Sequence, residues 1–297
     1  MSETDFEDAA LVLVGHGSTL NGDSSDPIYL HADAIRRKGL FTEVRECFWK
    51  LEPSISSVRD QVFASRVFIV PVFISEGYFT QQVIPRELGF CSNSDESFLR
   101  VREWNGQRCF YCDPVGTHPS MTEALSHRAQ EVLEMYPFPS RPRDEQVTLF
   151  IAGHGTGNNQ NSRRIIEQQA AQLRATGRYA DVHAVFMEEE PRIEACYEMA
   201  QSRNIVMVPF FISDGLHSFE DIPMMLGESA TVVEKRLKEG VPTWRNPTER
   251  QGKRVWYTRS IGLDAAISDV VLERAQEAAA WSGEERVSID SRGRKRA

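Results

Sequence analysis

The sequence predicts an α/β fold in which two similar doubly wound parallel-sheet repeats are related by a pseudo-twofold axis. Three stretches recur at one constant spacing, which indicates an internal duplication. Within each repeat, short apolar runs alternate with helical stretches, an order typical of parallel sheets with helices on both faces. The first apolar run of each repeat is continuous, as expected for a strand buried on both faces.

The duplication rests on three pairs of matching segments. They are LVLVGHGST (11–19) with LFIAGHGTG (149–157), FWKLEPSI (48–55) with FMEEEPRI (186–193), and VPVFISEGYFTQQVIPRELG (70–89) with VPFFISDGLHSFEDIPMMLG (208–227). His154 lies 138 residues after His16, and Pro191 and Pro209 lie at the same distance after Pro53 and Pro71. A single offset without gaps is not expected by chance, so we interpret the chain as two fused repeats.

In the first repeat, strands are predicted at 10–15, 44–49, 66–74 and 108–115. A helix from about 27 to 38 is predicted to end near Gly39, because glycine commonly follows the last turn of a helix. A second helix is predicted to begin at Glu52-Pro53-Ser54, since proline suits the first helical turn. An amphipathic helix at 117–136 closes the repeat.

The second repeat follows the same order as far as Gly227. It then carries an extra charged stretch at about 228–254, before a strand at 254–261 and a helix at 263–280. Three prolines in the linker at 136–146 disfavour regular structure there. We therefore predict domains at 9–135 and 147–280, followed by a polar, disordered tail at 281–297.

Composition narrows the class of protein. The chain has 297 residues, 41% of them hydrophobic and 26% charged, and a net charge of -9, which argues against general nucleic-acid binding. No apolar run approaches the roughly 20 residues needed to cross a bilayer, and the acidic N-terminus does not resemble a secretory signal. Five cysteines form no evident disulfide framework, so we expect a cytoplasmic protein without membrane or nucleic-acid partners.

Polar side chains follow three strands of the second repeat. His154 comes after the first strand, Glu188 after the second and His217 just past the third. Ligands of open parallel sheets bind beyond the carboxyl ends of the strands, so these three groups should converge. Two imidazoles and a carboxylate suit a borderline divalent metal, and the sequence therefore predicts a metal site here.

The first repeat tests this prediction internally. His16 matches His154, but Lys50 stands in place of Glu188 and Phe79 in place of His217. Neither a lysine nor a phenyl ring binds a metal at neutral pH. Asp221 is likewise matched by Val83 in the first repeat. We therefore predict one working site, in the second repeat, and a structural role for His16.

Other candidate groups carry weaker signals. Arg163 and Arg164 follow a Gly/Asn-rich loop at a predicted helix start, a position that suits substrate carboxylates. No GxxxxGK[ST] phosphate loop is present, which disfavours an ATP-driven reaction. Cys109 and Cys112 have CxxC spacing without a second ligand pair nearby, so we interpret them as buried strand residues.

Together these motifs resemble the class II chelatases of the CbiX/SirB group, the sirohydrochlorin cobalt- and ferrochelatases. The resemblance lies in GHGS (15–18), GHGT (153–156), FMEEEP (186–191) and VPFFISDGLHSFEDIP (208–223), and it covers roughly residues 9–135 and 147–280. It implies a chelatase-like fold in a fused two-repeat form, a monomer built as a pseudo-dimer, with His154, Glu188 and His217 as metal and catalytic residues. Protoporphyrin ferrochelatases share this fold, but the chain lacks their EHxET helix.

The resemblance also implies a reaction. A divalent metal, Co²⁺ or Fe²⁺ with Ni²⁺ as a further option, would be inserted without ATP into sirohydrochlorin, for cobalamin or siroheme synthesis. Two alternatives remain: a non-catalytic metal or tetrapyrrole carrier that uses the same three ligands, and a hydrolase that uses the hydroxyl of Ser18 or Thr156. The hydrolase is the weaker alternative, because neither hydroxyl lies in a nucleophile-elbow sequence.

Overall fold

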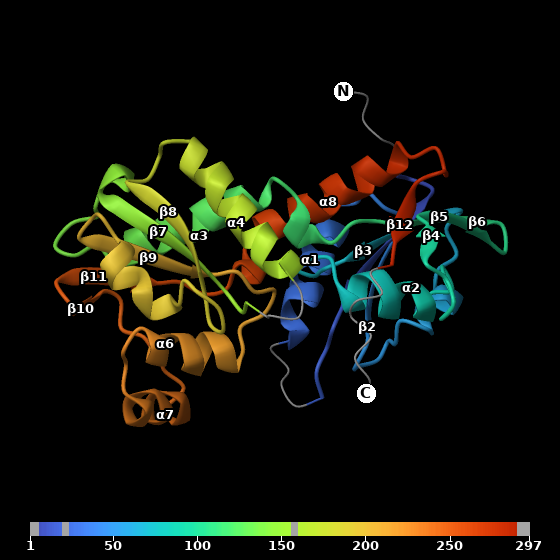
Figure 1. The fold of residues 1–297 in the computed structure, drawn as a ribbon. Coiled ribbons are helices and arrows are strands. Elements are labelled where there is room, and N and C mark those ends of the chain that lie inside the picture. The colour runs from blue at the N-terminus through green and yellow to red at the C-terminus, as the bar shows by residue number, and fades with distance from the viewer. Residues whose placement is uncertain (1–5, 20–23, 156–159, 290–297) are drawn as a thin grey trace. The chain divides into compact units, whose positions relative to one another are not determined.

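The computed structural model describes residues 6–19, 24–155 and 160–289 (Figure 1). The chain forms two compact units, one made of Met1–His118 with Ala265–Ala297 and the other of Pro119–Asp264. Each unit holds a five-stranded, mostly parallel sheet. The predicted α/β class with two similar sheets is confirmed. No helix within the described ranges is both long and apolar enough to span a membrane.

The sheet of the first unit has the strand order β2-β1-β3-β6-β5. The second strand in this order, β1, pairs in parallel with β2 and β3, so that Ala10 lies opposite both Glu43 and Val67. β6 runs parallel to β3, whereas β5 turns back antiparallel to β6, an edge strand that the sequence did not indicate. Its strands are β1 (Ala9–Gly15), β2 (Glu43–Phe48), β3 (Arg66–Pro71), β5 (Val101–Trp104) and β6 (Gln107–Tyr111), while β4 (Ser97–Leu99) lies outside this sheet.

Helices cover both faces of this sheet. α1 and α8 contact each other and the strands on one face, while short helical segments pack with the core cluster that includes Val12, Ile69 and Ile84. The helical segments are α1 (Asp26–Lys38), the 3-10 turns η2 (Val58–Gln61) and η4 (Val115–Thr117), the π-helix η3 (Phe79–Val83), α2 (Ile84–Glu87) and α8 (Ala266–Ala279).

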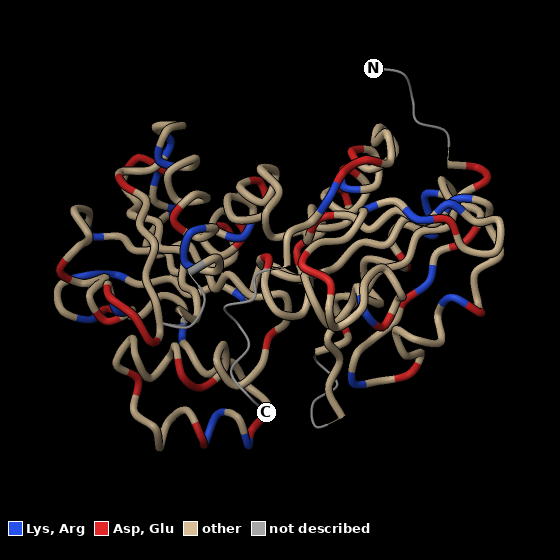
Figure 2. The backbone as a smooth tube through the Cα atoms, turned by 45° about the vertical axis from the view of Figure 1, so that its right-hand side comes forward, with Lys and Arg blue, Asp and Glu red and all other residues tan. Residues whose placement is uncertain are grey.

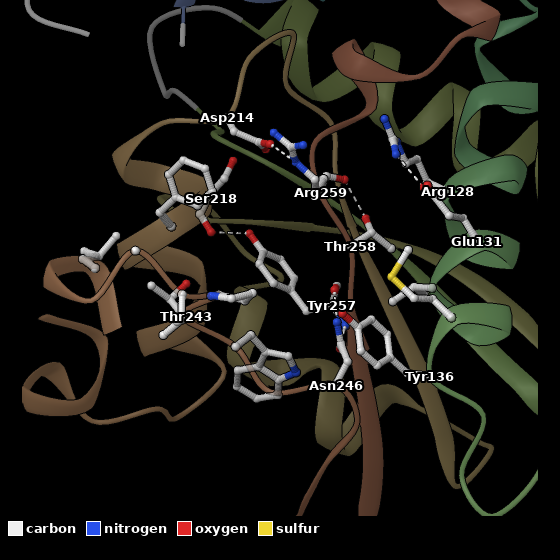
Figure 3. Close-up of a pocket in the computed structure, with 18 residues that line it drawn as sticks. Arg128, Glu131, Tyr136, Asp214, Ser218, Thr243, Asn246, Tyr257, Thr258 and Arg259 are labelled. Carbon is white, nitrogen blue, oxygen red and sulfur yellow. Dashed lines mark hydrogen bonds and ion pairs between the residues drawn. The ribbon is translucent and has the colours of Figure 1, made fainter. Parts of the chain in front are cut away.

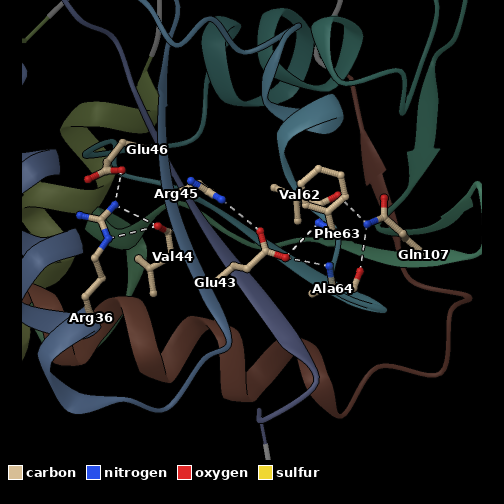
Figure 4. A network of polar contacts seen from close by, with 9 residues as sticks. All are labelled: Arg36, Glu43, Val44, Arg45, Glu46, Val62, Phe63, Ala64 and Gln107. Carbon is tan, nitrogen blue, oxygen red and sulfur yellow. Dashed lines mark hydrogen bonds and ion pairs between the residues drawn. The ribbon is translucent and has the colours of Figure 1, made fainter.

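Polar contacts fasten the edge strand β2 to its neighbours (Figure 4). The Glu43 carboxylate accepts hydrogen bonds from the backbone N–H groups of Phe63 and Ala64, both at 2.9 Å. On the other side, Arg36 of α1 donates to the Val44 carbonyl at 2.9 Å and pairs with the Glu46 carboxylate. The strand is therefore held both by its own helix and by the segment that leads into β3.

The sheet of the second unit has the order β10-β11-β9-β7-β8, with β7 between β9 and β8 and β10 antiparallel to β11. Every residue of β7 is buried, as expected for the first apolar run of each repeat. The strands are β7 (Val147–Gly153), β8 (Asp181–Phe186), β9 (Asn204–Pro209), β10 (Thr248–Arg250) and β11 (Lys253–Tyr257). The helical segments are α3 (Met121–Met135), η5 (Asp144–Gln146), α4 (Gln160–Ala175), η6 (Ile193–Ala195), α5 (Cys196–Met199), η7 (His217–Asp221), α6 (Ile222–Met225), α7 (Ala230–Lys238) and η8 (Ile261–Leu263).

The compact units differ from the predicted domains at 9–135 and 147–280, which follow the sequence repeats. The helix that closes each repeat belongs to the other unit: α3 packs on β9 and β11, and α8 packs on β3 and β6. Polar contacts fix α8 in the first unit, because Arg274 donates to the Pro114 carbonyl at 3.1 Å and to the Thr117 hydroxyl at 2.6 Å. The two repeats thus exchange their last helices.

Two local predictions are wrong. No helix begins at Glu52-Pro53, because the backbone there returns to the end of β2, where Phe48 N–H donates to the Pro53 carbonyl at 2.9 Å. The tail is not disordered from residue 281 onward, since β12 (Arg286–Ser288) pairs antiparallel with β4 of the first unit. Residues 290–297 lie outside the described part of the chain.

Candidate metal centre

His154 and Glu188 follow neighbouring parallel strands of the second unit. His154 comes directly after β7, and Glu188 lies two residues beyond the end of β8. The Glu188 N–H donates to the His154 carbonyl at 3.0 Å, so the two backbones are joined just past the sheet. Their side chains meet at the same edge, where the His154 Nδ1 atom lies 3.8 Å from a Glu188 carboxylate oxygen.

His217 reaches the same edge from the next strand in the sheet. It is the first residue of the π-helix η7, which follows β9, and its ring lies 4.9 Å from the His154 ring between centroids, at an interplanar angle of 80°. Single π-helical turns occur frequently at functional sites. The structure therefore brings together the three side chains that the sequence comparison selected.

Asp221 orients His217. Its carboxylate oxygen lies 2.6 Å from the His217 Nδ1 atom, four residues earlier in the same helix. Because a carboxylate only accepts hydrogen bonds, Nδ1 carries the hydrogen and the lone pair of Nε2 is left for another partner. The sequence singled out Asp221 only as a difference from Val83, although its spacing of four residues from His217 could have indicated the contact.

The site is partly open and incompletely paired. The side chains of His154, His217 and Glu188 are 33%, 50% and 59% exposed. The buried His154 Nδ1 atom has no hydrogen-bond partner among the described residues. Because buried polar atoms usually have a partner, this nitrogen is available to bind a ligand. Within those residues, no group of three or more His, Cys, Asp or Glu side chains is already arranged to hold a metal ion. An incoming ion would have to draw the three side chains together.

Glu188 is one of three consecutive glutamates, and the other two are engaged elsewhere. A Glu189 carboxylate oxygen accepts from Arg163 at 3.1 Å. The Glu190 carboxylate accepts from the Arg192 N–H at 3.1 Å, as the matching Glu52 does from the Ser54 N–H at 2.8 Å in the first unit. Both Glu190 and Glu52 therefore hold a loop in place, and Glu188 is the glutamate that faces His154.

The two arginines proposed for substrate carboxylates lie in different surroundings. Arg163 pairs with Glu167 at 2.9 Å and with Glu189, and its guanidinium lies 4.9 Å from the Phe186 ring centroid. Its charge is thus largely balanced inside the unit. Arg164 is exposed on the same helix.

Thr156, the hydroxyl considered for a hydrolase, lies outside the described residues. Basic and acidic residues are interspersed along both units (Figure 2).

The first unit repeats this geometry with different chemistry. The Lys50 N–H donates to the His16 carbonyl at 2.9 Å, and the rings of His16 and Phe79 lie 5.0 Å apart at 75°. These values match those of Glu188, His154 and His217, so Lys50 and Phe79 occupy the equivalent places. Two of the three candidate ligands are absent there, as the sequence predicted.

A cavity of about 510 Å³ lies beside η7 in the second unit (Figure 3). Ser218 and Phe219 of η7 line it together with Trp244 and Thr243 from the extra stretch that the first repeat lacks. The Tyr257 hydroxyl donates to the Ser218 carbonyl at 2.7 Å and so braces the helix that carries His217. The sequence signalled this region only as an insertion at 228–254, of which α7 and β10 are the regular parts.

Cys109 and Cys112 are buried and form no disulfide, which confirms their interpretation as core residues. Burial raises the pKa of the Cys109 thiol to about 12, and it raises the pKa of Cys112 as well. Both therefore stay protonated near neutral pH and are poor metal or redox groups.

A family model described as CbiX matches residues 10–132 and 148–278. The chain belongs to the CbiX family. A relative from Halobacterium salinarum, named "Probable sirohydrochlorin cobaltochelatase", is 40% identical over 285 residues, which are 93% of either chain. The "Sirohydrochlorin cobaltochelatase" of Methanopyrus kandleri is 30% identical over 140 residues, which are 44% of this chain and 96% of that one. The predicted family resemblance is confirmed.

Solved structures agree on the fold. A multi-domain protein of Deinococcus radiodurans with structural similarity to chelatases superimposes with a TM-score of 0.72 at 29% identity, and the match covers 93% of this CbiX-family chain and 56% of that protein. The chain thus spans little more than half of that structure. SirB from Bacillus subtilis with Fe³⁺ superimposes with a TM-score of 0.65 over 95% of this chain and 99% of its own. At 17% identity, SirB supports the fold alone.

Proposed function

We propose that this chain inserts a divalent metal into a sirohydrochlorin-type tetrapyrrole without ATP, at His154, Glu188 and His217 of the second unit. The observation that carries the proposal is the convergence of these three side chains in one unit and their replacement by Lys50 and Phe79 at the same geometry in the other. The substrate class comes from the names of the relatives.

The chemistry requires a metal ion to enter the ring while two pyrrole N–H protons leave it. The ion is a substrate of the reaction, not a resident cofactor. The Nε2 atom of His217, set by Asp221, and an imidazole nitrogen of His154 can hold the ion at first. Once it has passed to the ring, the same imidazoles can accept the protons, and the Glu188 carboxylate favours both the cation and the protonated imidazoles.

Cobalt is the metal that the proposal names, because both relatives are called cobaltochelatases. Imidazole and carboxylate ligands also accept Fe²⁺ and Ni²⁺. Independence from ATP is supported by the sequence, which has no phosphate-binding loop of the GxxxxGK[ST] type.

Purified protein mixed with metal-free sirohydrochlorin and Co²⁺, Fe²⁺ or Ni²⁺ in separate anaerobic reactions tests the proposal. The absorbance of the free base should disappear over many turnovers per protein molecule, fastest with Co²⁺ and with no added nucleotide. A change that stops at one equivalent would instead indicate a carrier. The His154→Ala variant serves as the comparison and should fall to the rate of the uncatalysed reaction.

A further inference from the structure

Aromatic side chains gather at the carboxyl edge of the first unit, where the second unit has its candidate ligands. The Trp49 ring lies 5.2 Å from the His16 ring and 4.9 Å from the Phe79 ring, between centroids. The Tyr78 ring follows at 5.7 Å from Phe79. Trp49 and Tyr78 are 36% and 50% exposed, so this cluster offers aromatic surface to solvent.

Two cations accompany the exposed rings. The Lys50 amine lies 3.7 Å from the Trp49 ring centroid, and no described carboxylate forms an ion pair with it. Arg86 lines a cavity of about 580 Å³ together with Trp49 and Tyr78, and its guanidinium donates to the Gln82 carbonyl at 2.9 Å. The cavity is within the usual size of small-molecule sites, ~300–1,000 Å³. One carboxylate, that of Glu87, also lines it.

The repeat comparison shows how the two edges differ in chemistry. Glu188 and His217, which suit a cation, are replaced by Lys50 and Phe79. Next to them, the buried Met187 is replaced by the exposed Trp49, and the aliphatic Leu216 by Tyr78. Three of the four replacements add a positive charge or an aromatic ring, and the fourth exchanges a metal-binding imidazole for a phenyl ring. The same backbone geometry therefore favours a flat anion in the first unit and a metal cation in the second.

We propose that the first unit binds a flat, conjugated polycarboxylate on Trp49 and Tyr78, with Lys50 and Arg86 pairing its carboxylates. Aromatic faces stack on conjugated rings, and guanidinium and ammonium groups donate charge-assisted hydrogen bonds to carboxylates. The choice of ligand class rests on the proposed function, because a sirohydrochlorin-type substrate is both conjugated and rich in carboxylates. The first repeat would then be an anion-binding site rather than a mere remnant.

Uroporphyrin, a metal-free conjugated polycarboxylate, is a suitable probe, titrated without metal into the full chain while porphyrin fluorescence anisotropy is recorded. Lys50→Gln should weaken binding by about tenfold, since it removes one charge-assisted contact. Trp49→Leu should weaken it similarly by removing the stacking surface. Lys50 is exposed, so its variant keeps the proposal testable even if Trp49→Leu loses stability.

Arg37→Gln is the matched control. Arg37 is exposed near the end of α1, at the opposite edge of the same sheet, and its substitution also removes one positive charge. It should leave the affinity within twofold of the unaltered chain. Equal losses in Lys50→Gln and Arg37→Gln, unchanged binding in Lys50→Gln, or no binding by the unaltered chain would each overturn the proposal.

The metal-insertion assay separates this proposal from the proposed function. If the chain inserts metal but Lys50→Gln binds the probe normally, the anion site is refuted and the chelatase stands. If the chain binds the probe through Lys50 but inserts no metal, the chelatase is refuted and the anion site stands.

Discussion

Lys50→Glu combined with Phe79→His should create a second metal site in the first unit. His16 is already present. The hydrogen bond from the Lys50 N–H to the His16 carbonyl and the distance between the His16 and Phe79 ring centroids each agree within 0.1 Å with the equivalent distances in the second unit. The two substitutions therefore place an imidazole and a carboxylate where the second unit has them. We expect Co²⁺ binding to change from one site per chain to two.

The new site should be weaker than the natural one by a calculable amount. His217 is oriented by Asp221, but the equivalent position in the first unit is the buried Val83. Losing such an orienting contact typically lowers metal affinity by about 10–100-fold, or about 1.4–2.7 kcal/mol. Phe79→His also replaces a phenyl ring that packs against several aromatic side chains by a more polar imidazole, which should lower the free energy of unfolding by about 1–3 kcal/mol.

Isothermal titration with Co²⁺ measures both sites, and thermal unfolding measures the stability loss. The cleanest chain also carries His154→Ala and His217→Ala, so that any Co²⁺ bound is in the new site. A folded double variant that binds no second Co²⁺ at concentrations 100-fold above the first dissociation constant would refute the reasoning from repeat geometry to metal ligands.

Three further predictions concern single residues. His217→Ala should abolish metal insertion with little change in melting temperature, because its side chain is half exposed. His16 is exposed too, and His16→Ala removes contacts within the first unit, such as those of its ring with Trp49 and Phe79, so that variant should keep its activity; loss of activity in His16→Ala alone would place the site in the first unit. Asp221→Asn should weaken Co²⁺ binding by about 10–100-fold in titrations, and an unchanged affinity would contradict its orienting role. Burial raises the pKa of the Cys109 thiol from 9.0 to about 12, so at pH 8 its thiolate fraction, and hence its rate of reaction with a disulfide reagent, should be about a thousandfold below that of a free thiol. The partly exposed Cys91 should react first. Fast reaction of Cys109 in the folded protein would contradict its burial.

Much of the architecture could be predicted because the chain repeats itself. Continuous apolar runs gave β1 and β7, and the rule that ligands bind beyond the carboxyl ends of parallel strands placed His154, Glu188 and His217 at one edge. The constant offset then separated Glu188 from its two neighbouring glutamates, by its alignment with Lys50. The structure adds that those neighbours bind Arg163 and the Arg192 backbone.

Other features depend on contacts that no local pattern reports. The segment at Glu52-Pro53 has the sequence of a helix start, but the Pro53 carbonyl accepts a hydrogen bond from the Phe48 N–H at the end of β2. This tertiary contact overrides the local preference for a helix. The π-helical turn at His217 and the antiparallel edge strands likewise have no clear sequence signal. The apolar residues of α3 and α8 indicate that one side of each helix is buried, but the pattern alone does not show which sheet covers it.

That exchange of closing helices has a consequence for protein engineering. A break in the linker near residue 140 would leave each fragment with a sheet whose covering helix is on the other fragment: α3 would remain with the first sheet's strands, and α8 with the second's. Neither fragment should fold alone, yet the two produced together should assemble through mutual complementation. The chain could thus serve as a split protein whose halves recover structure only when they meet.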